Sequence, residues 1–202
     1  MRKKSNGHRD NLRRSIALEA AKIIAEEGIT DYLLAKRKAA QRLGAMDLAG
    51  LPKNSEIEEA LGERLRLFDG DSHDHRLRTL RSTAREIMQV LEQFQPRLVG
   101  SVLSGMVTDH SDVTLHLFAD TPESVALALM ERAVPYELTE RRLRYLTDRT
   151  ESYPCYRFVA GETGVEGTVF PLLGMRQAPC CPIDGRPMRR AGIAEVESLL
   201  DA

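Results

Sequence analysis

The spacing of apolar residues divides the chain into a helical first part and a second part in which strands alternate with helices. In the first part, apolar residues recur at helical intervals over 11–27 and 31–43. Ser55 followed by Glu58 is a capping-box pattern, which predicts a third helix ending near residue 68. An apolar stripe over 75–93 predicts a fourth helix that leads into the first strand.

The second part contains two apolar runs separated by a polar loop, followed by further stretches of strand-forming residues. The first run ends at Gly100-Ser101, and the second alternates between two faces, with Asp112, Thr114, His116 and Phe118 on one and Val113, Leu115 and Leu117 on the other. Composition predicts further strands over 136–145, 153–160 and 164–170. Helices are expected after Pro122 and near the C-terminus. The sequence therefore predicts an α+β protein with a mixed sheet.

Composition indicates a soluble globular protein with a true core. The chain has 202 residues, of which 42% are hydrophobic and 29% charged, and its net charge is -1. None of its apolar stretches approaches the length needed to span a bilayer, so we expect no membrane partner. Two of the three cysteines are adjacent, which favours free thiols and a reducing cytoplasm.

Charge is distributed unevenly between two expected domains, a basic helical segment over 1–70 and a sheet domain over 71–202. Residues 1–44 carry eleven Lys and Arg against five acids, a surplus of six positive charges. Such an asymmetry can mark a surface that faces nucleic acid. The candidate nucleic-acid contacts are Arg13, Arg14, Lys36, Arg37 and Lys38. Three interpretations are open: contact with RNA such as tRNA, a helix-turn-helix that binds DNA, and a solvated basic face.

The candidate chemistry lies at Gly100, Ser101 and Asp112. Gly100 permits close approach of the backbone to a ligand, and Ser101 adds a hydroxyl. Backbone amides of such a bend can bind an anion. Asp112 stands at the mouth of the next strand. This arrangement suits a phosphate beside a metal ion.

The chain carries Gly-Ser, then nine residues, then Ser-Asp followed by alternating apolar residues. This pattern resembles the signature of the DNA polymerase β-like nucleotidyltransferase superfamily, over roughly 80–170. That superfamily includes kanamycin nucleotidyltransferase. The resemblance implies that Gly100 and Ser101 hold a nucleoside triphosphate, and that carboxylates spaced i and i+2 bind Mg²⁺ with a third from a later strand. Here Asp112 matches, whereas the second position is Thr114, a poor ligand for a hard cation.

Glu166 is the candidate for the third carboxylate, since alternation places it with Thr168 and Phe170 on one face of its strand. Asp112 and Glu166 would then be the catalytic pair and the ligands of one Mg²⁺. Arg142 and Arg144 share one face of the 136–145 strand and are candidate phosphate contacts, although charges that protect an edge strand explain them equally well.

The favoured interpretation is a nucleotidyltransferase-fold protein that binds a nucleoside triphosphate, RNA or both, with an incomplete metal site and weak or no transfer. One alternative is an active Mg²⁺-dependent enzyme that modifies a hydroxyl of an RNA, a protein or a small molecule. The other is a helix-turn-helix regulator that binds DNA.

Overall fold

The computed structural model describes residues 2–45 and 50–201, and these residues form two compact units. The helical unit comprises the chain up to His73 together with 108–110 and 182–184. The sheet unit comprises 74–107, 111–181 and the chain from Gly185 onward. The division at His73/Asp74 lies three residues after the boundary expected at 70/71, inside a long helix that begins at Gly70.

Three helices build the helical unit: α1 (Arg2–Glu27), α2 (Tyr32–Arg42) and α3 (Asn54–Phe68). Helix α1 packs against both α2 and α3. Apolar residues of the three helices are buried between them, namely Ile16, Ala20, Ile23, Ala35, Ala39, Ile57 and Leu61, whereas Leu33, Leu34 and Leu43 of the second predicted stripe are exposed. Small residues on α2 allow its backbone to approach α1 closely, which suits a tight helical hairpin.

Side chains fix the starts of two of these helices. Asp31 caps α2, because its carboxylate accepts hydrogen bonds from the amides of Leu33 and Leu34 at 2.8 and 3.1 Å. Helix α3 begins one residue before the expected Ser55 cap. The carboxylate of Glu56 accepts a 2.6 Å hydrogen bond from the Lys53 amide, so Glu56 rather than Glu58 closes the first turn.

The sheet unit is built on a five-stranded mixed sheet in the order β1-β2-β5-β4-β3. Its strands are β1 (Arg97–Val99), β2 (Val113–Phe118), β3 (Tyr136–Arg144), β4 (Thr150–Ala160) and β5 (Thr163–Phe170). Strand β2 runs antiparallel to β1 and parallel to β5, and the β5-β4-β3 part is antiparallel. The α+β class and the mixed sheet expected from the sequence are both present.

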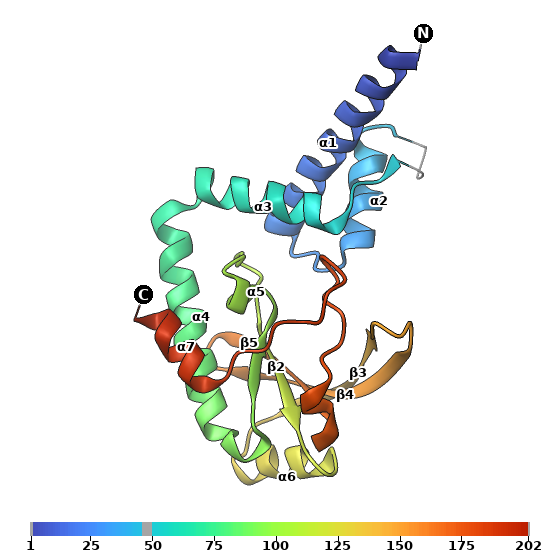
Figure 1. Ribbon diagram of the computed structural model, residues 1–202. Helices are drawn as coiled ribbons and strands as arrows, with labels where there is room; N and C mark the ends of the chain where they lie inside the picture. Colours follow the sequence, from blue (N-terminus) through green and yellow to red (C-terminus); the bar gives the residue numbers. More distant parts are fainter. Residues whose placement is uncertain (1, 46–49, 202) are drawn as a thin grey trace. The chain divides into compact units, whose positions relative to one another are not determined.

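One face of the sheet is covered by helices α4 (Gly70–Val90), α6 (Glu123–Glu131) and α7 (Ile193–Leu200), as Figure 1 shows. Aliphatic residues of β2 and β5 meet apolar residues of these helices in one continuous core. Helices α4 and α7 lie side by side, and the Arg81 guanidinium donates to the Leu199 carbonyl at 3.1 Å. The aliphatic face of β2 therefore packs against the helices, while on its other face His116 and Phe118 are also buried and Thr114 is partly exposed.

Two sequence expectations around the sheet are wrong in detail. The apolar stripe predicts a helix over 75–93, whereas α4 already begins at Gly70 and ends at Val90. The loop after β1 opens with a short helix, α5 (Gly100–Ser104), because Val102 and Leu103 are buried in the core and their burial favours a helical turn.

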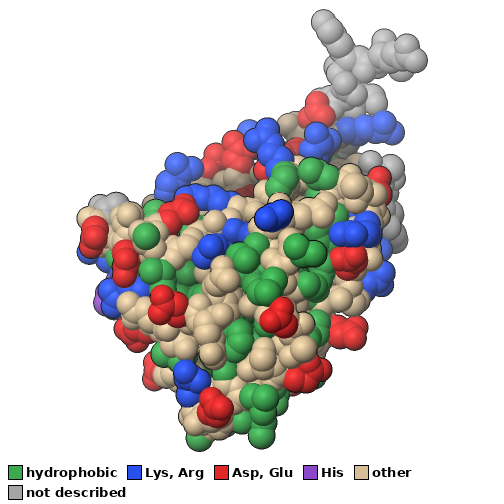
Figure 2. All heavy atoms as spheres, turned by 60° about the horizontal axis from the view of Figure 1, so that its bottom comes forward, with side chains coloured by type: hydrophobic (Ala, Val, Ile, Leu, Met, Phe, Trp, Pro, Cys, Tyr) green, Lys and Arg blue, Asp and Glu red, His purple; other side chains and the backbone are tan. Residues whose placement is uncertain are grey.

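The opposite face of the sheet is polar near Thr114 and aromatic near Phe118 and Phe170. The short 3₁₀ helix η3 (Leu172–Arg176) contacts β2 and β5 on the unit's surface. Further along, Leu98 and Ala191 exchange two backbone hydrogen bonds of 2.9 Å, which attach the C-terminal segment to the β1 edge. On the face of the molecule shown in Figure 2, acidic and basic side chains are interspersed around exposed apolar ones.

Candidate functional site

The polar face of the sheet brings Thr114 and Glu166 together. They are register partners on the parallel strands β2 and β5, so their side chains point to the same side of the sheet. Neighbouring strands lie about 4.8 Å apart. The structure thus places the second position of the expected carboxylate pair directly beside the expected third carboxylate, and the second position carries a hydroxyl.

Asp112 lies at the same end of the sheet. Its carboxylate covers Gly164, since a Cβ built on that glycine would stand 2.3 Å from Oδ1 of Asp112. Loss of hydration raises the pKa of Asp112, the negative charge of Glu166 raises this pKa further, and Arg157 opposes the change. The negative charge of Glu166 therefore lies close enough to Asp112 to raise the pKa of that carboxyl.

Gly100 and Ser101 border this cluster from β1. Gly100 has φ +73°, a left-handed conformation that favours glycine. A Cβ on Gly100 would lie 3.8 Å from the Thr114 side chain, so the Gly100 backbone passes over Thr114. Ser101 follows as the second residue of α5, and its carbonyl accepts bonds from the amides of Gly105 and Met106.

Two arginines bind Glu166. Arg141 on β3 donates from Nη2 to one carboxylate oxygen at 2.6 Å, and Nε of Arg157 on β4 lies 3.2 Å from the other oxygen. The Glu166 side chain is only 15% exposed, whereas each arginine side chain is 49% exposed. Both oxygens of this carboxylate are thus engaged by guanidinium groups that also face solvent.

Arg142 and Arg144, the phosphate contacts predicted from the sequence, lie elsewhere on β3. Strand alternation places both on the face opposite to Arg141. Both are exposed, and Arg144 lies 3.9 Å from the carboxylate of Asp148 in the adjoining turn. The structure does not bring either side chain to Glu166.

The residues at this site do not fit the Mg²⁺ that the family resemblance implies. Among the residues that the structure describes, no group of three or more His, Cys, Asp or Glu is arranged to hold a metal ion. Thr114 supplies no charge, and a cation at Glu166 would have to displace the hydrogen bond from Arg141 and the ion pair with Arg157. The side chains present at this end of the sheet instead form a mixed cluster of two acids and two arginines.

A second polar cluster lies two residues further along β2. Nε of Arg190 donates to Nδ1 of His116 at 2.9 Å, and its Nη1 donates to the Gly174 carbonyl at 2.8 Å. The guanidinium also lies over the rings of Phe118 and Phe170 at 5.1 and 5.0 Å. Burial first and the Arg190 charge second lower the pKa of His116 to about 3, so this histidine is neutral at physiological pH. Arg190 therefore anchors the C-terminal segment to the sheet.

Carboxylates engage part of the basic surface predicted to contact nucleic acid. The guanidinium of Arg13 donates to Glu56 at 3.1 and 2.5 Å, and the Lys38 ammonium donates to Glu27. Loss of hydration lowers the pKa of the half-buried Lys36. Arg14 on α1 and Arg37 on α2 are exposed.

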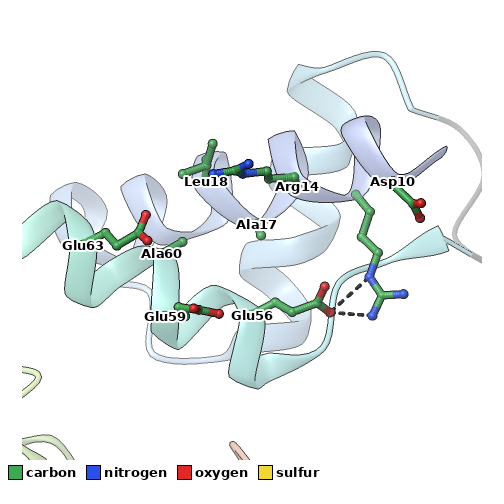
Figure 3. Close-up of a pocket in the computed structure, with 9 residues that line it drawn as sticks. Asp10, Arg14, Ala17, Leu18, Glu56, Glu59, Ala60 and Glu63 are labelled. Atoms are coloured by element: carbon green, nitrogen blue, oxygen red, sulfur yellow. Dashed lines mark hydrogen bonds and ion pairs between the residues drawn. The ribbon is translucent and has the colours of Figure 1, made fainter. Parts of the chain in front are cut away.

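Figure 3 shows the hollow that α1 and α3 enclose. Acidic side chains dominate its lining beside two arginines, the polar residues being Asp10, Arg13, Arg14, Glu56, Glu59 and Glu63. A phosphate in this hollow would meet four carboxylates. The hollow therefore does not favour an anionic ligand.

Comparison with known proteins leaves the resemblance to the nucleotidyltransferases as an expectation. No protein-family model matches the chain, and neither does any curated protein. Over the described ranges 2–45 and 50–201, the helices are too short or too polar for any of them to cross a membrane. Any function assigned to this chain therefore rests on the geometry of the site.

Sequence reasoning missed Arg141 and Arg157. The signal for Arg157 was present, because the two residues Gly161 and Glu162 link β4 to β5 as a tight hairpin. That turn fixes the pairing and sets Arg157 opposite Glu166. Arg141 depends on the register of a third strand, and period-two alternation alone does not say which of its two faces looks toward Glu166.

Proposed function

We propose that the sheet unit is a nucleotidyltransferase-like fold that binds a nucleoside triphosphate on its polar face and transfers a nucleotide weakly or not at all. The mixed sheet, the Gly100 bend over Thr114 and the nearby Asp112 support this proposal. Gly100, Ser101 and Asp112 follow one another along the chain in the order of the superfamily signature.

The observation that carries the proposal is the pair of half-exposed arginines at Glu166. A guanidinium has five N–H donors in a planar fork, which suits the oxygens of a phosphate. Each arginine reaches Glu166 from one side, so donors remain for a ligand in the solvent. The backbone at Gly100 and the hydroxyl of Thr114 add neutral groups at the same end of the sheet.

Weak transfer is expected because position 114 carries a threonine and not a carboxylate. Nucleotide transfer forms a bond from an acceptor oxygen to the α-phosphorus, while the bond to pyrophosphate breaks and the acceptor proton leaves. The acid that would accept this proton or hold a cation at the attacking oxygen is replaced by the hydroxyl of Thr114. Binding therefore has more support than chemistry.

RNA has weaker support as a ligand of the helical unit. Two of the five basic residues expected to bind it are paired with acids, and an acidic hollow lies beside Arg13 and Arg14. The exposed Arg14 and Arg37 remain as contacts for a phosphate backbone. The proposal accordingly places the nucleotide on the sheet unit.

The test of this function is equilibrium binding. Fluorescent ATP and GTP analogues are titrated with the full chain, with the Arg141→Gln, Arg157→Gln double variant and with Arg78→Gln on the exposed face of α4. We expect the double variant to raise the Kd by at least about tenfold, because it removes two charge-assisted donors. Arg78→Gln should leave the Kd unchanged within about twofold, as expected for an exposed charge away from the site.

Two results would contradict this function. One is that neither nucleotide analogue binds. The other is that Arg142→Gln, on the opposite face of β3, weakens binding as much as the double variant does. Nucleotide transfer itself is measured with α-phosphate-labelled nucleoside triphosphates and total RNA or protein as acceptor, and strong labelling that is lost in Asp112→Ala would establish the active-enzyme alternative.

A further inference from the structure

We infer that Arg141 and Arg157 take the place of a divalent cation, so that this protein holds a triphosphate without a metal, in competition with its own Glu166. This inference rests on the proposed function, because it concerns the same face of the sheet. It adds the mode of recognition and assigns two ligand-binding residues that the family signature does not contain.

The contacts at Glu166 show that the protein's own arginines supply positive charge here, where a metal ion was expected. Each oxygen of its carboxylate lies within 3.2 Å of a different guanidinium, at 2.6 Å for Arg141 and 3.2 Å for Arg157. The two arginines come from neighbouring strands, so the antiparallel sheet itself fixes their separation. In the free protein, Glu166 thus holds two positive charges close together at this place on the sheet.

Glu166 balances charge in the free protein. Two guanidinium groups at one end of a sheet repel each other, and the carboxylates of Glu166 and Asp112 neutralise them in the free protein. A triphosphate carries more negative charge than these two acids together. Its phosphates would contact the solvent-facing N–H groups and draw the arginines away from Glu166.

This arrangement reverses the effect that neutralising either acid should have on triphosphate binding. In a metal site, Glu166 and Asp112 hold the cation that holds the phosphates, so neutralising either acid weakens binding. In the arginine site, the same acids compete with the phosphates, so neutralising either one strengthens binding. The direction of a single substitution therefore separates the two modes.

The first experiment uses the unmodified chain. The Kd of the fluorescent ATP and GTP analogues is measured in EDTA and then in excess Mg²⁺. We expect binding in EDTA to be as tight as in Mg²⁺ or tighter, because Mg²⁺ neutralises the phosphates that the arginines attract. Inorganic triphosphate should displace the analogues in EDTA, since the phosphates supply the recognised group.

The second experiment uses charge-neutral variants of nearly unchanged size. Glu166→Gln and Asp112→Asn are each expected to lower the Kd in EDTA by about threefold or more, because each removes a negative charge next to the arginines. The matched control is Glu162→Gln, an exposed glutamate in the turn between β4 and β5, for which no such tightening is expected. Circular dichroism checks that the variants are folded.

The outcomes distinguish this inference from the proposed function. Binding that requires Mg²⁺ and is lost in Glu166→Gln would overturn the inference and leave nucleotide binding in place. Absence of binding in both buffers would overturn both. If a variant does not fold, the EDTA and Mg²⁺ titrations of the unmodified chain still decide between the two modes.

Discussion

Thr114 and Glu166 face each other across the parallel strands β2 and β5 as register partners. This relationship puts a neutral hydroxyl at the position where the family resemblance calls for a carboxylate. The acid beside it is bound by two arginines instead. The site therefore places a neutral hydroxyl next to an acid whose charge is balanced by two arginines.

Replacing Thr114 with Asp should create affinity for a divalent cation. The new carboxylate would point to the same face of β2 as Asp112, next to Glu166, and three carboxylates supply the oxygen ligands that hard cations prefer. We expect the Kd for Mn²⁺, followed by electron paramagnetic resonance, to fall by at least about tenfold relative to the unmodified chain. The matched control is Thr147→Asp, which adds the same charge in an exposed turn. Equal Mn²⁺ affinity in both variants would refute the site geometry.

Arg190 should contribute to the stability of the sheet unit. Arg190→Met keeps the apolar stem but leaves the buried Nδ1 of His116 and the Gly174 carbonyl without their donor. Leaving buried acceptors unsatisfied should cost about 2 kcal/mol of unfolding free energy. Urea titrations followed by tyrosine fluorescence report mainly on this unit, which contains four of the five tyrosines, Tyr136, Tyr145, Tyr153 and Tyr156.

Arg189→Met is the control for this measurement. Arg189 is 64% exposed and its partner Glu195 is 42% exposed, so the loss of this ion pair should change the unfolding free energy by less than about 0.5 kcal/mol. Equal effects of the two substitutions would mean that the buried contacts of Arg190 contribute nothing specific.

His116 should make the stability of the sheet unit depend on pH. Its pKa is lowered from 6.5 to about 3 in the folded protein, by burial first and by Arg190 second. The unfolded chain binds a proton below about pH 6.5 while the folded protein does not, so the stability from neutral His116 is present above pH 6.5 and is lost as pH falls toward 3.

The measurement compares the unmodified chain with His116→Gln. The difference in unfolding free energy between the two should fall by about 1.4 kcal/mol per pH unit between pH 6 and pH 4. Gln retains an acceptor for Arg190 but does not titrate. A difference that stays constant over this range would show that His116 is not held neutral in the folded state.

The local pattern of apolar and polar residues predicted much of this fold. Alternation along β2 identified the face that packs against the helices, and helical spacing identified α1 and α2. The convergence of Asp112 and Glu166 was expected on the condition that their strands pair, and β2 does pair with β5. These features depend on short-range periodicity, which a sequence carries directly.

The parts of the site that were not predicted from the sequence depend on the register of several strands and on tertiary contacts. Alternation showed that Arg142 and Arg144 share a face, but only the pairing of β3 with β4 shows that Arg141 is the residue directed toward Glu166. The contact between Arg190 and His116 joins residues 74 positions apart, and no local pattern specifies it. Tertiary packing, rather than propensity, selects these partners.

A crystal structure of the full chain with a nonhydrolysable nucleoside triphosphate, grown in the presence of Mg²⁺, would decide whether arginines or a metal ion hold the phosphates. We expect the triphosphate beside Gly100, with its oxygens within hydrogen-bonding distance of Arg141 and Arg157 and with no cation ligated by Glu166. A Mg²⁺ ion bound by Asp112 and Glu166, with both arginines turned away, would contradict recognition by the arginines.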